Sequence, residues 1–196
     1  MSYKYIDMIH PLVDFLQLMH PFTSEEEQMI ADAFETRVYD EGDYVFHAGQ
    51  VCREMFFTTD GIIMIHELNE HGNELVHYFL PKNHFLTILP SFYDNSISKE
   101  SLIAACPAEA LVISKTKLED LCAKIPFLPG LIDRVIQQTL VEKIQTRNAY
   151  HFIDASSRYK LFLKKQPYIA QNVSLGYTAS YLGITQQSLS RIRKNI

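Results

Sequence analysis

The last stretch of the chain carries side chains that could bind a nucleic acid. From Thr185 to Asn195 the sequence reads Thr-Gln-Gln-Ser-Leu-Ser-Arg-Ile-Arg-Lys-Asn, without an acidic residue. Glutamine amides and arginine guanidinium groups can form paired hydrogen bonds with base edges, and lysine and arginine also bind phosphates. The residues that we expect to contact DNA are Gln186, Gln187, Ser188, Arg191, Arg193 and Lys194.

Two short helices joined at a glycine would hold these side chains in place. Gly183 can adopt the positive φ of a sharp turn, and the Thr185 hydroxyl can cap the helix that follows. The apolar residues at helical spacing would face inward: Leu182, Ile184, Leu189 and Ile192. The pattern is typical of a helix-turn-helix, whose second helix enters the major groove. A helical hairpin that never meets DNA has the same pattern, so the motif alone leaves that alternative open.

The distribution of charge favours DNA binding by this end of the chain. Residues 155–196 contain seven lysines and arginines and no acidic residue. The remaining 154 residues contain 11 cations and 23 acids, a net charge of −12, within a total of −5 for the chain. We therefore expect the C-terminal end to bind DNA and the acidic body to be repelled by it.

Composition argues against several other classes of protein. With 196 residues and 47% hydrophobic content the chain can build a sizeable core, and no apolar run reaches the length of a membrane span. The N-terminus has no signal-peptide pattern, so we expect a cytoplasmic protein that does not bind membranes. Cys52, Cys106 and Cys122 are too scattered for a disulfide framework or a metal cluster. Four histidines in one stretch match no common ligand spacing, and we expect neither metal nor cofactor: His66, His71, His77 and His84.

The order of the expected elements predicts an α+β protein. Helices are indicated at residues 3–19, at 24–34 behind a capping box of Ser24 and Glu27, and at 117–123, 128–152 and 157–165, the last capped by Asp154 and Ser156. Between residues 37 and 114, short β-branched and aromatic runs alternate with turn residues, which predicts an antiparallel β-roll or sandwich. The expected domains are residues 1–127, a long helix and hinge at 128–153, and a DNA-binding domain at 154–196.

The long helix at residues 128–152 has an apolar stripe that changes face along its length. It begins with Leu128, Leu131, Ile132 and Val135 and drifts through Ile136 and Leu140 to Ile144. Such a helix is buried on two sides, and the same helix of a second subunit could cover the second side. A helix-turn-helix that reads two half-sites needs two copies held apart, which favours a homodimer. A core helix of a single chain is the alternative.

The chain resembles the Crp/Fnr family of bacterial transcription regulators over nearly its whole length. The resemblance rests on a set of short motifs: Glu41-Gly42-Asp43 with Gly49, Met55-Phe56-Phe57 with Gly61, Asn69 to Glu74 around Gly72, Phe152-Ile153-Asp154, Tyr181 to Thr185, and Leu189-Ser190-Arg191. It implies a cyclic-nucleotide-binding-like β-roll, or jelly roll, with a dimerisation helix and a helix-turn-helix. The family's β-hairpin wing is expected to be missing, because Ile196 directly follows the second helix.

The family's cyclic-nucleotide cassette is degenerate in this chain. Thr87 and Ile88 stand where a Gly-Glu pair meets the ribose, and Ser98 and Lys99 stand where an Arg-Ser pair meets the phosphate. Ile88 cannot accept a hydrogen bond, and an ammonium lacks the planar fork of a guanidinium. These four residues are our candidates for a ligand pocket that does not bind cyclic AMP, and the effector is an unknown small molecule.

The sequence thus predicts a homodimeric, sequence-specific DNA-binding transcription regulator that is not an enzyme. Its expected partners are operator half-sites in double-stranded DNA, a second copy of itself and an effector, with RNA polymerase as a further candidate. The alternative is a small-molecule-binding β-roll whose C-terminal helices dock a protein partner. An enzyme on a cupin-like roll would need a metal triad or a nucleophile motif, and the sequence has neither.

Overall fold

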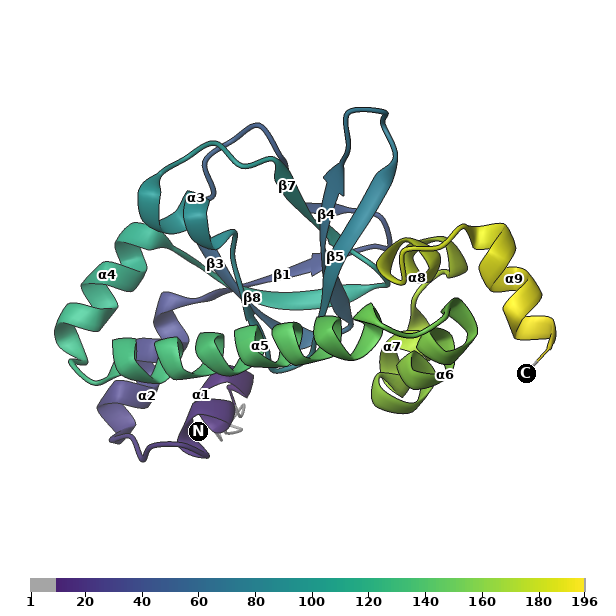
Figure 1. Cartoon of the computed structure of the whole chain (residues 1–196). Helices are drawn as coiled ribbons and strands as arrows, with labels where there is room; N and C mark the ends of the chain where they lie inside the picture. The colour runs from purple at the N-terminus through teal and green to yellow at the C-terminus, as the bar shows by residue number, and fades with distance from the viewer. Residues whose placement is uncertain (1–9, 196) are drawn as a thin grey trace, which may run out of the picture.

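The computed structural model describes residues 10–195 of the chain. A β-roll lies at its centre, with helices at both ends and one long helix along its side (Figure 1). The strands are β1 (Glu35–Tyr39), β2 (Tyr44–Phe46), β3 (Glu54–Asp60), β4 (Ile62–Leu68), β5 (Glu74–Pro81), β6 (Phe85–Leu86), β7 (Glu100–Ala104) and β8 (Ala108–Ser114). They form two four-stranded sheets in the orders β1-β8-β3-β6 and β2-β7-β4-β5. All pairings are antiparallel, which confirms the predicted roll.

Apolar side chains from both sheets fill the space between them. Phe56 and Val112 from one sheet and Ile63 and Leu102 from the other are at most 1% exposed. The tight connection between β3 and β4 depends on Gly61, which has φ +73°. A Cβ there would lie 2.2 Å from the carbonyl oxygen of Pro107, so no larger residue fits this turn.

Two helices cover one end of the roll: α1 (Pro11–Gln17) and α2 (Ser24–Ala33). Within the described chain, the helix expected at residues 3–19 begins at Pro11, because proline fits the first turn of a helix but not its interior. Residues 3–9 lie outside the described residues. The predicted capping box is one residue too late, since Thr23 and Glu26 form it in place of Ser24 and Glu27. The sequence offers both overlapping pairs, and local pattern alone does not choose between them.

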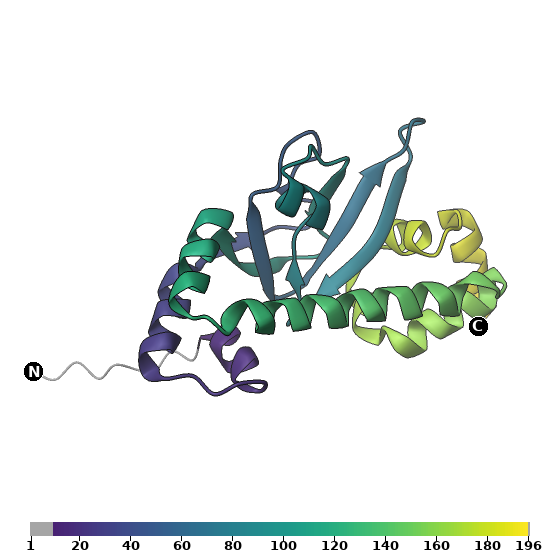
Figure 2. The ribbon, with the colours of Figure 1, turned by 60° about the vertical axis from the view of Figure 1, so that its left-hand side comes forward.

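The other elements after the roll follow the expected order. The predicted short helix is α4 (Lys115–Lys124), which Ser114 caps. The long helix α5 (Leu128–His151) runs from α4 along the roll to the C-terminal helices (Figure 2). Two six-residue helices, α3 (Leu89–Asp94) and α7 (Pro167–Asn172), were not predicted, because a segment this short shows little periodicity.

Four helices form the C-terminal end: α6 (Ala155–Lys165), α7, α8 (Leu175–Tyr181) and α9 (Gln186–Lys194). Asp154 alone caps α6 by accepting hydrogen bonds from the amides of Ser156 and Ser157, so Ser156 lies inside the helix. One apolar cluster joins these helices to the roll: Met64, Phe79 and Ile103 pack with Phe162, Ala179, Leu182 and Leu189. The helices therefore share a core with the sheet of β4 and β5. In the part of the chain that the structure describes, no helix is long and apolar enough to cross a membrane.

Candidate DNA-reading surface and ligand pocket

Helices α8 and α9 form the predicted helix-turn-helix. Gly183, in the turn between them, has φ +66°, and the amide of Ile184 donates to the carbonyl oxygen of Ala179 at 3.0 Å. Leu182 and Leu189 are at most 1% exposed and pack in the crossing between the helices. The turn thus has the left-handed backbone that glycine allows, and the two helices share one apolar contact.

The expected cap fixes the start of α9. The Thr185 hydroxyl accepts a hydrogen bond from the Ser188 amide at 3.1 Å and donates to the Ser188 hydroxyl at 2.9 Å. The side chain of Ser188 therefore has a partner inside the protein and retains its own proton for a base or a phosphate. All six predicted DNA-contacting residues are exposed: Gln186, Gln187, Ser188, Arg191, Arg193 and Lys194.

The exposed face of α9 is positively charged and has no internal counterion. Across residues 10–195, none of Arg191, Arg193 and Lys194 has a carboxylate within salt-bridge distance. All three lie in the last turn of the helix, whereas the two glutamines lie in its first turn. The amides at the start of α9 can therefore hydrogen-bond to base edges while the cations near its end bind phosphates.

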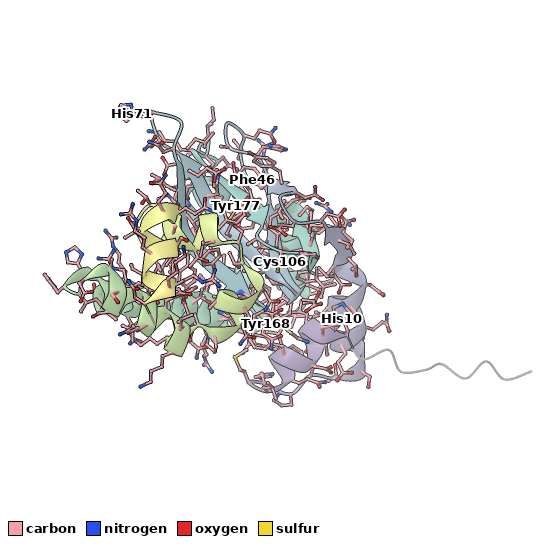
Figure 3. The ribbon with its side chains drawn as sticks, turned by 90° about the vertical axis from the view of Figure 1, so that its right-hand side faces the viewer. His10, Phe46, His71, Cys106, Tyr168 and Tyr177 are labelled. Carbon is pink, nitrogen blue, oxygen red and sulfur yellow. The ribbon has the colours of Figure 1, made fainter. Side chains whose placement is uncertain are left out.

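A contact that the sequence did not reveal attaches this unit to the roll. The Ser180 hydroxyl accepts a hydrogen bond from the amide of Val76 at 2.9 Å and donates one to the carbonyl oxygen of Glu74 at 2.8 Å. Both partners lie on β5, the edge strand of its sheet, so one hydroxyl occupies the place of a missing neighbouring strand. Tyr181 packs edge-on against Phe79, with ring centroids 4.9 Å apart. Figure 3 shows the C-terminal helices toward the viewer, and it labels His71 at the tip of the β4–β5 hairpin.

Arg158 connects the segment between α5 and α6 to the turn of the helix-turn-helix. Its guanidinium donates to the carbonyl oxygen of Ile153, just before α6, and to that of Leu182, just before Gly183. Its Nε is buried and has no hydrogen-bond partner in the described chain. Neighbouring Phe152, at the end of α5, is 91% exposed. Arg158 therefore ties two backbone segments together without a carboxylate of its own.

The second half of α5 presents apolar side chains to solvent. Leu128, Leu131, Ile132 and Val135 are buried against the roll, whereas further along the helix Leu140, Val141 and Ile144 are 39%, 51% and 59% exposed. The stripe changes face as the sequence pattern indicated. Within residues 10–195 no segment covers the exposed part. Adjacent apolar side chains on one helix are the feature that a second helix would bury.

A cavity of about 130 Å³ lies between the roll and α5. Thr87 and Ile88 line it, as do Tyr78, Glu100 and Lys143. The Thr87 hydroxyl donates to the carbonyl oxygen of Glu54 at 2.9 Å and is therefore engaged away from a ligand. Most of the remaining lining is aliphatic or aromatic, so the cavity has few polar anchors.

The other two ligand-pocket candidates lie outside this lining. Ser98 is 6% exposed, and its hydroxyl donates to the carbonyl oxygen of Glu100 and accepts from the amide of the same residue. Lys99 is exposed to solvent. The local turn uses the Ser98 hydroxyl, and Glu100, one residue further along, reaches the cavity instead. Of the four candidate residues, Thr87 and Ile88 line this cavity, and Ser98 and Lys99 do not.

Within residues 10–195, no group of three or more His, Cys, Asp or Glu side chains is arranged so that it could hold a metal ion. Cys52 and Cys106 are buried, and Cys122 is half-buried. His66 is 3% exposed, and this burial lowers its pKa below 6.5 although Glu74 opposes the shift. The buried cysteines and His66 contribute to packing.

Comparison with known proteins supports this architecture. Residues 36–125 match the family model described as Cyclic nucleotide-binding domain. No curated protein sequence matches the chain significantly. Among solved structures, the c-di-GMP-responsive global regulator CLP of Xanthomonas campestris superposes with a TM-score of 0.70 at 18% identity, over 88% of this chain and 91% of that one.

Two further structures have the same arrangement of elements. The catabolite activator protein of Thermus thermophilus matches with a TM-score of 0.55 at 16% identity, over 92% of this chain and 85% of its own. A regulator of the crp/fnr family from Eubacterium rectale matches with a TM-score of 0.70 at 13% identity, over 93% and 87% of the two chains. At these identities the likeness establishes the fold.

Proposed function

We propose that this chain, which contains a cyclic nucleotide-binding domain and has the fold of Crp/Fnr transcription regulators, is a homodimeric, sequence-specific DNA-binding regulator. The observation that carries the proposal is the exposed face of α9, which has amides at its start, cations at its end and no acidic residue. An operator is the partner that uses both kinds of side chain, because base edges take amides and phosphates take cations.

The chemistry of α9 specifies which bases it prefers. Gln186 and Gln187 suit the paired donor and acceptor of adenine, and Arg191 suits the two acceptors of guanine. Arg193 and Lys194 contribute contacts to phosphates, which strengthen binding without selecting a sequence. The half-site read by one subunit therefore combines adenine and guanine contacts within the few base pairs that one recognition helix spans.

The surface of α5 supports dimerisation. A second copy of the helix, packed about a two-fold axis, would cover the exposed Leu140, Val141 and Ile144. The pair would place two α9 helices on one face of a duplex, with half-sites about one helical turn apart. The operator is therefore expected to be an inverted repeat.

The roll supplies control through the cavity against α5. A cyclic nucleotide would need a planar cationic fork for its phosphate and a carboxylate for its ribose, and Thr87 and Ile88 provide neither. We assign the cavity to an effector other than cyclic AMP. For this effector to regulate the protein, it must bind more tightly to one orientation of the C-terminal helices than to another.

Footprinting and gel-shift measurements on the DNA upstream of the protein's own gene test the proposal. The Arg191→Ala variant should lose about 1–3 kcal/mol of binding free energy on the protected site, or roughly fivefold to 150-fold in Kd. Lys124→Ala, which removes an exposed cation from α4, is the matched control and should bind normally.

Equal binding by Arg191→Ala and the control would refute the assignment of α9 as the reading helix. Failure to bind any duplex would favour the alternative, in which the C-terminal helices dock a protein partner.

A further inference from the structure

Two hollows of the molecule meet at the middle of α5. One is the apolar cavity described above. The other is a groove of about 520 Å³ that extends from β5 along α5 to α6 and the turn at Gly183. Tyr78, Glu100 and Lys143 line both, so the two spaces are neighbours. The Lys143 ammonium lies 5.8 Å from the centroid of the Tyr78 ring, which places a cation at their junction.

The groove is an electropositive site. Its lining includes the permanent cations Lys143, Arg147 and Arg158 and one carboxylate, that of Glu100. Within residues 10–195 none of these three cations forms a salt bridge. Cations that line one concave space repel each other, and an anion between them would lower that repulsion. His77, which also lines the groove, is already hydrogen-bonded to Glu67.

Buried polar groups beside the groove also lack partners. The Tyr150 hydroxyl and the Arg158 Nε have no hydrogen-bond partner in the described structure, and Tyr150 is only 8% exposed. Burial raises the pKa of the Tyr150 phenol, so at neutral pH it carries its proton and can donate. Buried donors normally have acceptors, so two residues that line this groove each retain unused hydrogen-bonding capacity.

The neighbouring cavity favours a different part of a ligand. Its volume of about 130 Å³ is close to that of the apolar protein cavity of ~150 Å³ that binds benzene. Leu80, Phe85, Leu86 and Ile136 are among its lining residues, and the Thr87 hydroxyl is engaged by Glu54. An apolar group of about six carbons fits such a space better than a sugar phosphate does.

We infer that the effector is an amphiphilic anion, with its apolar part in the cavity of the roll and its carboxylate or phosphate head in the groove between Lys143, Arg147 and Arg158. This inference rests on the proposed function and specifies the class of its ligand. The head group would lie against Arg158, which already holds the carbonyl oxygens of Ile153 and Leu182. Binding of the effector would thereby affect the segment at Ile153 and the turn of the helix-turn-helix, both of which Arg158 contacts.

Calorimetry on the purified full-length protein tests this with four probes: hexyl phosphate, hexanoate, hexanol and inorganic phosphate. At least one of the two hexyl anions should bind with a Kd tenfold or more below those of hexanol and inorganic phosphate, because only the anions fill both spaces. The hexyl anion with the lower Kd identifies the head group as a phosphate or a carboxylate. Equal affinity of the anions and hexanol, or absence of binding by both anions, would overturn the inference.

Variants locate the head group. Arg147→Gln should weaken binding of the preferred anion about tenfold, the size expected for one charge-assisted hydrogen bond. Lys160→Gln removes an exposed cation of α6 outside the groove and should leave the Kd unchanged. An unchanged Kd in Arg147→Gln would refute the groove as the head-group site. Gel shifts with the same proteins without ligand distinguish this failure from a failure of DNA binding.

Discussion

Replacing Ser180 by alanine tests how α8 and α9, the proposed DNA-reading unit, are held against the roll. The change removes one hydrogen bond to the amide of Val76 and one to the carbonyl oxygen of Glu74. Each hydrogen bond contributes about 0.5–1.5 kcal/mol net, and a buried amide left without a partner costs more. Val76 is 6% exposed, so water would not readily replace the hydroxyl while the helices remain docked. We expect the docked arrangement to lose about 2 kcal/mol.

Hydrogen exchange measures this loss at a single site. A cost of about 2 kcal/mol corresponds to roughly a 30-fold larger open population, so the Val76 amide should exchange at least tenfold faster in Ser180→Ala. Ser190→Ala is the matched control, because Ser190 is a half-buried serine on α9 whose side chain makes no hydrogen bond within the described residues. If the Val76 amide exchanges at the same rate in both variants and the parent, the hydroxyl does not hold the unit in solution and the reasoning fails.

Three further outcomes are expected. Ile144→Glu should convert the proposed dimer to a monomer in sedimentation velocity, because a charge is costly in an apolar interface, and should change the melting temperature of the single chain little, since Ile144 is 59% exposed there. A dimer that the variant leaves unchanged would place the interface elsewhere. Cyclic AMP in millimolar excess should leave the melting temperature unchanged, because only binding to the folded state raises it; a clear rise would show that the cavity accepts a cyclic nucleotide. The free energy of unfolding should fall as the pH drops below 6.5, because His66 takes up a proton more readily in the unfolded chain than in the folded protein, where it is buried. His66→Gln should reduce that fall in denaturant titrations, and an equal fall in both proteins would contradict this role of His66.

The sequence predicted what depends on neighbours along the chain. The turn at Gly183, the cap by Thr185 and the exposed face of α9 all follow from spacings of a few residues, and the structure has each of them. The drift of the apolar stripe on α5 is likewise a property of one helix. Local pattern was insufficient at the start of α2, where Thr23 and Ser24 are both competent caps.

What the sequence could not predict depends on contacts between distant residues. Ser180 and Val76 are 104 positions apart, and nothing about a serine on a short helix indicates that it will pair with a strand edge. The positions of Ser98 and Lys99 outside the cavity lining have a related cause. Ser98 and Lys99 were assigned by alignment without gaps, whereas the local turn directs the Ser98 hydroxyl to Glu100 and leaves Lys99 in solvent.

The two hydrogen bonds from Arg158 to carbonyl oxygens connect the end of α5 directly to the C-terminal helices. Because one guanidinium donates to the carbonyl oxygens of both Ile153 and Leu182, a movement of the turn before α9 relative to Ile153 would have to stretch or break one of these hydrogen bonds. In the proposed function, one side chain therefore connects the end of α5 to the helix-turn-helix. A β-roll that responds to a different effector could therefore control the same α9 helix without any change in α9. It would only need to pass its conformational change to the end of α5.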